Sequence, residues 1–137
     1  MILQIITVGT LKEGYLKDAL AEYKKRLSQY ARVEEINIKE EAIANEDDKT
    51  QVMRALSVEG EKIIAALPRD AAKIALCVEG KQMTSEQLAE YIESASSLSG
   101  CLCFVIGGSH GLAPSVKSRA KFRLSMSPMT FPHQLAR

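Results

Sequence analysis

Two stretches of the chain combine residue types that could take part in chemistry. The first, residues 104–114, reads FVIGGSHGLAP and places three glycines within five positions around the pair Ser109-His110. Adjacent glycines remove Cβ atoms and let backbone N–H and C=O groups face a ligand at close range. A tight strand-to-helix turn, the simpler alternative, would need only one flexible residue. The spacing therefore favours a loop that contacts a ligand.

The second stretch, residues 128–137, reads PMTFPHQLAR and carries His133 directly after Pro132. An imidazole changes its protonation near neutral pH, so His133 is a candidate for moving a proton during catalysis. The plainer alternative is a helix cap or a hydrogen bond that fixes the loop. His110 is interpreted as an exposed loop histidine, with contact to RNA as its alternative role.

The cysteines give little support to a metal site. Cys77, Cys101 and Cys103 all lie in apolar, strand-like runs, no C-x-x-C motif occurs, and neither histidine is spaced as a partner. We expect buried free thiols in a reducing compartment, and no zinc or other metal.

The glycine loop does not match the common phosphate-binding motifs. A P-loop needs Gly-Lys-Ser/Thr after its glycines, whereas Ser109-His110 follows here. A dinucleotide fingerprint needs G-x-G-x-x-G after the first strand, and the chain has GTLKEG at residues 9–14. A nucleoside held by backbone and apolar contacts remains compatible with the loop.

The charge of the chain is distributed unevenly. The 137 residues carry a net charge of +1, yet all 17 acidic residues lie in residues 1–93. Such a one-sided basic segment suggests an anionic partner such as a nucleic-acid backbone, and a solvated basic helix face is the alternative. The basic residues of the acid-free segment 94–137 are Lys117, Arg119, Lys121, Arg123 and Arg137.

Strand and helix patterns alternate along the chain, in one domain spanning residues 1–137. Apolar runs predict strands at 2–8, 33–38, 73–78, 101–106 and 122–127. Helical periodicity predicts helices at 15–30, at 49–67, from Thr84 to about 98 and after Pro114. Gly80 is expected to end the third strand, residues 39–48 to form a mobile loop, and residues 128–137 to form a loop.

This alternation predicts an α/β fold with a parallel sheet and helices on both faces. Ligands of such sheets bind beyond the carboxyl ends of the strands. Three loops should therefore lie near one another, namely those after the strands at 73–78, 101–106 and 122–127. Gly60 lies inside the second helix, where glycine is about 1 kcal/mol less favourable than Ala. Either a neighbour approaches closely at this position or the helix is weak.

Several segments together resemble one known family. TVGTLKEGY, LCVEGKQMTSEQLAEYI, FVIGGSHGL and LSMSPMTFPHQLAR occur in order over essentially the whole chain and are similar to the ribosomal RNA large-subunit methyltransferase H family. These proteins are SPOUT-class methyltransferases, so the resemblance implies a parallel-sheet α/β sandwich with a C-terminal trefoil knot. It also implies a bacterial, cytoplasmic homodimer without metal or membrane segment.

The resemblance further implies the reaction and its site. The family transfers a methyl group from S-adenosyl-L-methionine to N3 of a pseudouridine in helix 69 of 23S rRNA, within the large subunit of the assembled 70S ribosome. The basic residues of segment 94–137 then become candidates for RNA contact, and contact with an opposite subunit is the alternative for Arg137. The implied cofactor-binding residues are Leu76, Gly107, Met126, Ser127, Pro128, Met129, Thr130 and Phe131.

Family members continue for about 20 residues beyond the equivalent of Arg137, which leads us to expect a chain truncated at its C-terminus and lacking the helix that completes the knot. Two other functions stay open. A non-catalytic ribosome-binding or assembly factor could share the fold and the basic segment, and a flavodoxin-like enzyme would bind a phosphorylated ligand instead.

Overall fold

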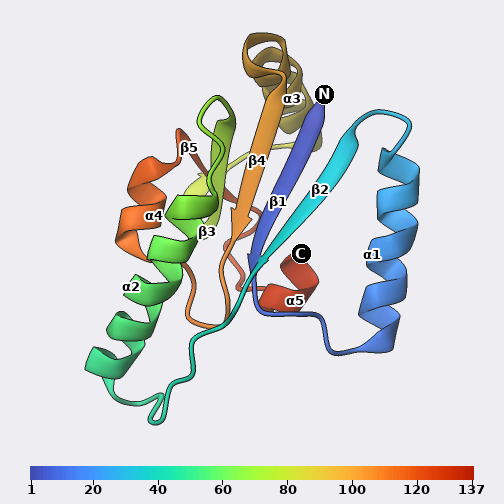
Figure 1. Ribbon diagram of the computed structural model, residues 1–137. Coiled ribbons are helices and arrows are strands. Elements are labelled where there is room, and N and C mark those ends of the chain that lie inside the picture. The colour runs from blue at the N-terminus through green and yellow to red at the C-terminus, as the bar shows by residue number, and fades with distance from the viewer.

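The computed structural model describes residues 1–137 and contains a single five-stranded parallel sheet (Figure 1). The strand order is β2-β1-β4-β3-β5, so β1 and β4 are central and β2 and β5 form the edges. The strands are β1 (Ile2–Val8), β2 (Arg32–Ile38), β3 (Ala72–Gln82), β4 (Cys101–Ile106) and β5 (Phe122–Ser125).

Helices cover both faces of this sheet. α2 and α4 pack together on one face, α3 packs on the other, and α1 lies beside the edge strand β2 (Figure 1). No helix is long and apolar enough to cross a membrane. The helices are α1 (Gly14–Leu27), α2 (Lys49–Ala66), α3 (Ser85–Ser99), α4 (Pro114–Arg119) and α5 (His133–Ala136).

The two faces of the sheet bury separate hydrophobic clusters. Ile6, Ile63 and Val116 belong to the cluster between the sheet and α2 and α4. Ile74 and Leu102 are fully buried in the cluster beneath α3. Strands that bury side chains on both faces read as continuous apolar runs, which is why β1, β3 and β4 were evident in the sequence.

The capping signals predicted for α3 are confirmed. Thr84 accepts a hydrogen bond from the Gln87 backbone N–H at 3.2 Å, and the Gln87 side chain accepts one from the Thr84 N–H at 3.0 Å. This capping box fixes the start of the helix because it satisfies two otherwise unpaired donors. Gly100, with a φ of 66°, ends the helix in the left-handed conformation.

Other expectations are corrected. β3 does not end at Gly80 but continues to Gln82, and β5 is shorter than predicted because it stops at Ser125. The C-terminal segment is not only loop, since His133–Ala136 form the short helix α5. Only Cys103 is buried among the three free cysteines, whereas Cys77 and Cys101 are half-buried.

The glycine inside α2 and the acidic segment before it both have packing roles. A Cβ at Gly60 would lie 3.0 Å from the Ala113 Cβ, so the close approach of α4 explains the glycine. The segment between β2 and α2 contacts the helix that follows it, and its mobility stays a prediction. The buried Glu59 accepts a hydrogen bond from the Glu41 N–H at 3.0 Å, and Asp48 caps α2.

Candidate functional site

A cavity of about 640 Å³ opens at the carboxyl ends of β3, β4 and β5. It brings together the three loops that the sequence predicted to lie near one another. Its size lies within the roughly 300–1,000 Å³ range of small-molecule pockets. The predicted cofactor-binding residues and the candidate proton acceptor that line the cavity are Leu76, Gly107, Met126, Ser127, Met129, Thr130, Phe131 and His133. His110 and Lys117, which were singled out for other roles, line it as well.

One wall is a bulge in β3. Leu76 and Lys81 both pair with Leu124 of β5, so the residues between them leave the hydrogen-bonded ladder. Cys77, Val78 and Glu79 of this bulge line the cavity. The loop after the strand at 73–78 was predicted to lie at the site, but none of these three residues was named as a binding residue. The available signal was Gly80, which was interpreted as the end of a strand but in fact lets the chain rejoin β5.

The glycine loop forms the opposing surface. The Gly111 N–H donates to the Gly108 carbonyl at 3.1 Å, and the φ of Gly111 is 79°, so residues 108–111 make a tight turn. A Cβ on Gly107 would lie 2.4 Å from the Gly111 carbonyl oxygen, which no folded chain tolerates. The turn therefore needs a residue without a side chain at Gly107, directly where the backbone faces the cavity.

The third wall follows β5. The Ser125 hydroxyl donates to the Ser127 carbonyl at 3.0 Å, and the Ser127 hydroxyl accepts from the Met129 N–H at 3.1 Å. These two bonds order a segment that has no regular secondary structure. Pro128 is exposed and is not among the lining residues, so the structure does not bring this member of the predicted set into the cavity.

Three side chains that line the cavity carry an imidazole or a thiol group. His133 begins α5, where the cap is Pro132 and no side chain caps the helix, so the capping role considered for His133 is not seen. His110 is exposed as expected, and its Nε2 lies 3.9 Å from a Glu46 carboxylate oxygen. Burial, and then the charge of Glu79, raise the pKa of the Cys77 thiol, which stays protonated and a poor nucleophile.

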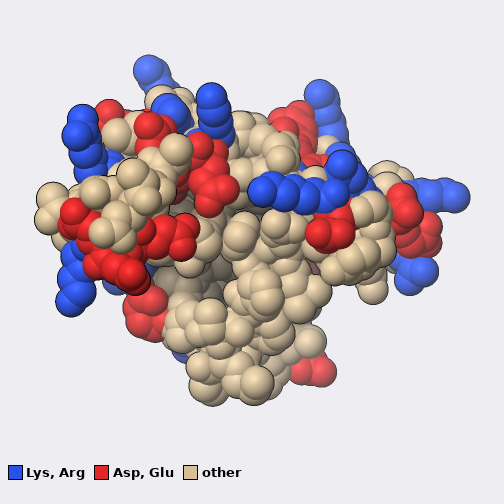
Figure 2. All heavy atoms as spheres, turned by 90° about the horizontal axis from the view of Figure 1, so that it is seen from below, with Lys and Arg blue, Asp and Glu red and all other residues tan.

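The face that contains the cavity has a broad uncharged area. Figure 2 shows this end of the sheet, with tan residues filling the lower half of the view and Lys, Arg, Asp and Glu spread over the upper half and the left side. Acidic side chains gather on the side of α2. Glu79 and Lys117 are the only Asp, Glu, Lys or Arg residues that line the cavity. An apolar ligand body with few charges fits such a lining better than a polyphosphate does.

The five basic candidates for RNA contact divide into different environments. Arg119, Lys121 and Arg123 are exposed and have no ion-pair partner. Lys117 instead forms an ion pair with Glu79, and its side chain turns into the cavity, with 22% of it exposed. The basic segment is therefore not one continuous surface.

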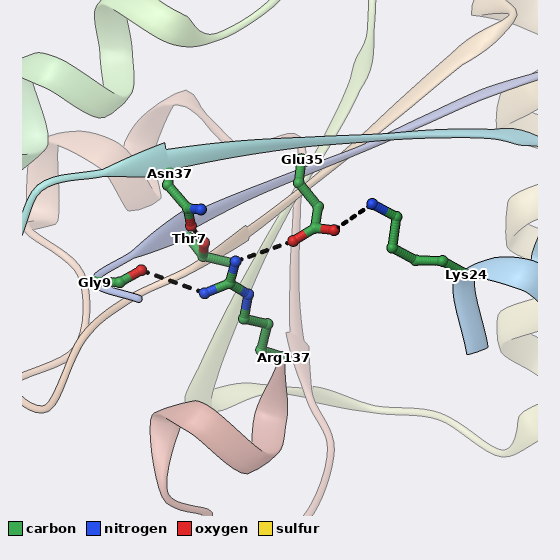
Figure 3. A network of polar contacts seen from close by, with 6 residues as sticks. All are labelled: Thr7, Gly9, Lys24, Glu35, Asn37 and Arg137. Carbon is green, nitrogen blue, oxygen red and sulfur yellow. Dashed lines mark hydrogen bonds and ion pairs between the residues drawn. The ribbon is translucent and has the colours of Figure 1, made fainter. Parts of the chain in front are cut away.

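Arg137 departs most from its expected role. Its side chain is 8% exposed, and its Nη2 lies 3.0 Å from a Glu35 carboxylate oxygen while its Nη1 donates to the Gly9 carbonyl at 3.3 Å (Figure 3). Lys24 of α1 contacts the other Glu35 oxygen at 2.6 Å. A guanidinium held in this way is not available to an RNA phosphate, because its charge is already paired inside the protein.

This cluster predicts a pH-dependent stability. Burial by itself would raise the pKa of Glu35, but hydrogen bonds and charge from Lys24 and Arg137 outweigh it and hold this pKa below its ordinary value of 4.5. The ionised Glu35 therefore contributes its full stabilisation above pH 4.5, and the contribution is lost as the pH falls through the lowered pKa. Glu35→Gln should destabilise the protein by about 1–3 kcal/mol at pH 7.

Urea unfolding of the wild type and Glu35→Gln between pH 3 and 7 measures this effect. The difference between the two proteins should stay constant down to about pH 4.5 and shrink below it. Glu34→Gln, at the neighbouring position of β2 where the carboxylate contacts Gln4 and Arg32, is the matched control. If the difference in free energy of unfolding between the wild type and Glu35→Gln persisted unchanged at pH 3, the ionised Glu35 would not be the source of the stabilisation.

The sequence of the chain is similar to those of one family of known proteins. A family model described as "Predicted SPOUT methyltransferase" matches residues 1–137. The chain is 46% identical over 138 residues to ribosomal RNA large subunit methyltransferase H of Bacillus pumilus, covering all of this chain and 87% of that protein. It is 47% identical over 137 residues to the protein of the same name from Shouchella clausii, covering 98% and 86% of the two chains.

A similar match is found with the protein of that name from Exiguobacterium sibiricum, at 45% identity over 136 residues. The family-model match covers the whole chain, and the five-stranded parallel α/β architecture agrees with it. The chain therefore belongs to the ribosomal RNA large subunit methyltransferase H family of SPOUT methyltransferases.

Proposed function

We propose that this chain transfers a methyl group from S-adenosyl-L-methionine to N3 of a pseudouridine in helix 69 of 23S rRNA, on the assembled ribosome. The observation that carries the proposal is the convergence of the β3 bulge, the glycine loop and the segment after β5 around one mostly uncharged cavity. Family membership gives the reaction class, and the names of the relatives indicate a ribosomal RNA substrate.

The lining fits the adenosyl part of this cofactor. Backbone groups at Gly107 and Gly108 can approach the edge of the adenine closely because no side chain intervenes. Leu76, Met129 and Phe131 supply apolar surface for its faces. Pro128, which is outside the lining, is left out of the proposed cofactor-binding set, whose other members are Leu76, Gly107, Met126, Ser127, Met129, Thr130 and Phe131.

When bound, S-adenosylmethionine supplies an activated methyl group, and the chain's own residues have to orient the target nitrogen in line with it. Holding two reacting groups in the right geometry contributes several kcal/mol to lowering the barrier. The N3 proton of the target must also leave. His133 lines the cavity without a capping role, so we propose it as the candidate acceptor of this proton.

The RNA surface in this proposal consists of Arg119, Lys121 and Arg123, which are exposed and unpaired next to the cavity-lining Lys117. Changing all three to Gln should weaken ribosome binding and flatten its dependence on salt, because each lost phosphate contact removes about 0.7–0.9 from the logarithmic salt slope. Binding to 70S ribosomes at several KCl concentrations measures this prediction.

A control with the same charge change uses Lys25, Lys49 and Arg54, which are exposed on α1 and α2. These three changes should leave the salt slope nearly unaltered. Equal losses for the two triple variants would mean that binding depends on total charge and not on the proposed surface.

A homodimer in the cytoplasm is part of the proposal. Several large apolar side chains near the cavity are exposed, with Met126 at 55%, Met129 at 75% and Leu135 at 59% exposure. Exposed apolar groups concentrated at one site are typical of an interaction surface, and a second copy of the chain would cover them.

Methyl transfer to defined substrates tests the proposed function. Radiolabelled S-adenosylmethionine is offered with 70S ribosomes that carry either pseudouridine or uridine in helix 69, and with naked 23S rRNA. We expect label in N3-methylpseudouridine only with the pseudouridine-containing ribosomes, as read by mass spectrometry of nuclease digests. Ribosome binding without cofactor binding would instead favour a non-catalytic assembly factor.

A further inference from the structure

Lys117 and Glu79 form an ion pair, and both residues line the cavity. Lys117 belongs to α4 and Glu79 to the β3 bulge, so the pair joins two elements that are far apart in sequence. The hydrogen bond from Lys117 is the main reason that the pKa of Glu79 lies below its ordinary value, so Glu79 is a carboxylate near neutral pH. No other Asp, Glu, Lys or Arg lines the cavity.

One opposite-charge pair in an otherwise uncharged lining matches the charge pattern of the proposed cofactor. The adenosyl part of S-adenosylmethionine is neutral, whereas its amino-acid end carries an ammonium and a carboxylate close together. A zwitterion of this kind needs one anionic and one cationic partner, and charged hydrogen bonds to both are about twice as strong as neutral ones.

We propose that Lys117 and Glu79 exchange their contact with each other for contacts with the ligand, Lys117 binding the carboxylate and Glu79 the ammonium of the amino-acid end. The inference rests on the proposed function. In the free protein each group serves as the counterion of the other, so neither charge is left unpaired before the ligand enters. The exchange replaces one ion pair with two.

The partial exposure of both groups permits this exchange. The Lys117 side chain is 22% exposed and that of Glu79 is 54% exposed, so each can rotate toward solvent without disrupting the core. A fully buried pair would resist opening because both charges would lose their partner in a low-dielectric environment. The same pairing explains why Lys117 is set apart from the exposed basic residues of its segment.

Three nucleoside ligands separate recognition of the amino-acid end from recognition of the adenosyl part. S-adenosylmethionine and S-adenosylhomocysteine both carry the zwitterion, whereas 5′-deoxy-5′-methylthioadenosine lacks it. Isothermal titration calorimetry of Lys117→Met and Glu79→Gln should show about a tenfold loss of affinity for each of the first two ligands. The affinity for methylthioadenosine should stay within about twofold of that of the wild type, since the change lies outside the adenosyl contacts.

Two further variants sharpen the test. Lys117→Arg keeps the charge and should recover most of the affinity for S-adenosylhomocysteine, which a purely steric effect of Met would not predict. Lys25→Met makes the same substitution at an exposed position of α1 that does not line the cavity, and should leave all three affinities unchanged. Thermal unfolding of each variant confirms that the protein is folded.

The outcomes are distinct. Equal losses for all three ligands, or no loss for any, would overturn the inference and leave the proposed function standing, because the cavity would still bind the adenosyl part. A wild-type protein that binds none of the three ligands would overturn the proposed function and this inference together.

Discussion

Gly107→Ala should abolish detectable binding of S-adenosylmethionine and lower kcat/KM for methyl transfer by about 100-fold or more. The added Cβ would lie 2.4 Å from the carbonyl oxygen of Gly111 and 2.5 Å from its carbonyl carbon. Both atoms are backbone, so no side chain can rotate away, and the turn at residues 108–111 has to open. That movement displaces the backbone groups that face the adenine in the proposed complex.

Calorimetry with S-adenosylhomocysteine and a methyl-transfer assay on ribosomes measure the two effects. Gly14→Ala is the matched control, because a Cβ at this position meets nothing within 4 Å and the residue begins α1. The control should bind normally and be no less stable, since Ala favours a helix over Gly by up to about 1 kcal/mol. Normal cofactor affinity in Gly107→Ala would show that the glycine loop does not form the binding surface.

Gly80→Ala should destabilise the whole domain by about 1–3 kcal/mol, the range seen when a packed site is overfilled. Its Cβ would lie 2.7 Å from the carbonyl carbon of Leu124 and 2.8 Å from the Arg123 oxygen and the Ser125 nitrogen. β5 is an edge strand that pairs only with β3, so separation of the two strands leaves β5 without a partner. The free energy of unfolding from urea titration measures the loss.

Val78→Ala is the control for this second variant. It removes a side chain that is 50% exposed from the same bulge and should change the free energy of unfolding by less than about 1 kcal/mol. A Gly80→Ala protein as stable as the wild type would mean that β3 and β5 do not approach each other at this point. A loss of similar size in both variants would attribute the effect to the bulge in general.

The fold was largely predictable because its central strands and helices carry strong local signals. The run at 101–106 predicts β4 with its observed bounds, and the Thr84–Gln87 capping box predicts the start of α3. The β3 bulge was not predictable in the same way, because whether Gly80 ends a strand or lets it pass close to β5 depends on a neighbour 44 positions away. The trefoil knot and the assignment of residues 1–137 to a single domain stay predictions.

The residues of the candidate site were also predicted from the sequence only in part. Gly107 and the segment after β5 were found through glycine spacing and family resemblance, and both line the cavity. Glu79 lies in the loop that was predicted to face the site after the strand at 73–78, but no binding role was assigned to it, because nothing local distinguishes a glutamate after an apolar run from any exposed one. Arg137 was assigned to RNA from its charge alone, whereas the structure pairs it with Glu35.

By itself, the sequence determined the α/β class, the order of strands and helices, the three loops that face one another and the family of the protein. Those properties depend on hydrophobic periodicity, helix caps and motifs, and each of these signals lies within a short segment of the sequence. Only the tertiary structure decided which charged groups are free and which are paired. Pairing depends on distances between residues that are remote in sequence, such as Lys117 and Glu79 or Arg137 and Glu35. Folding brings these charges together, and that contact determines whether each one can bind a ligand or an RNA phosphate.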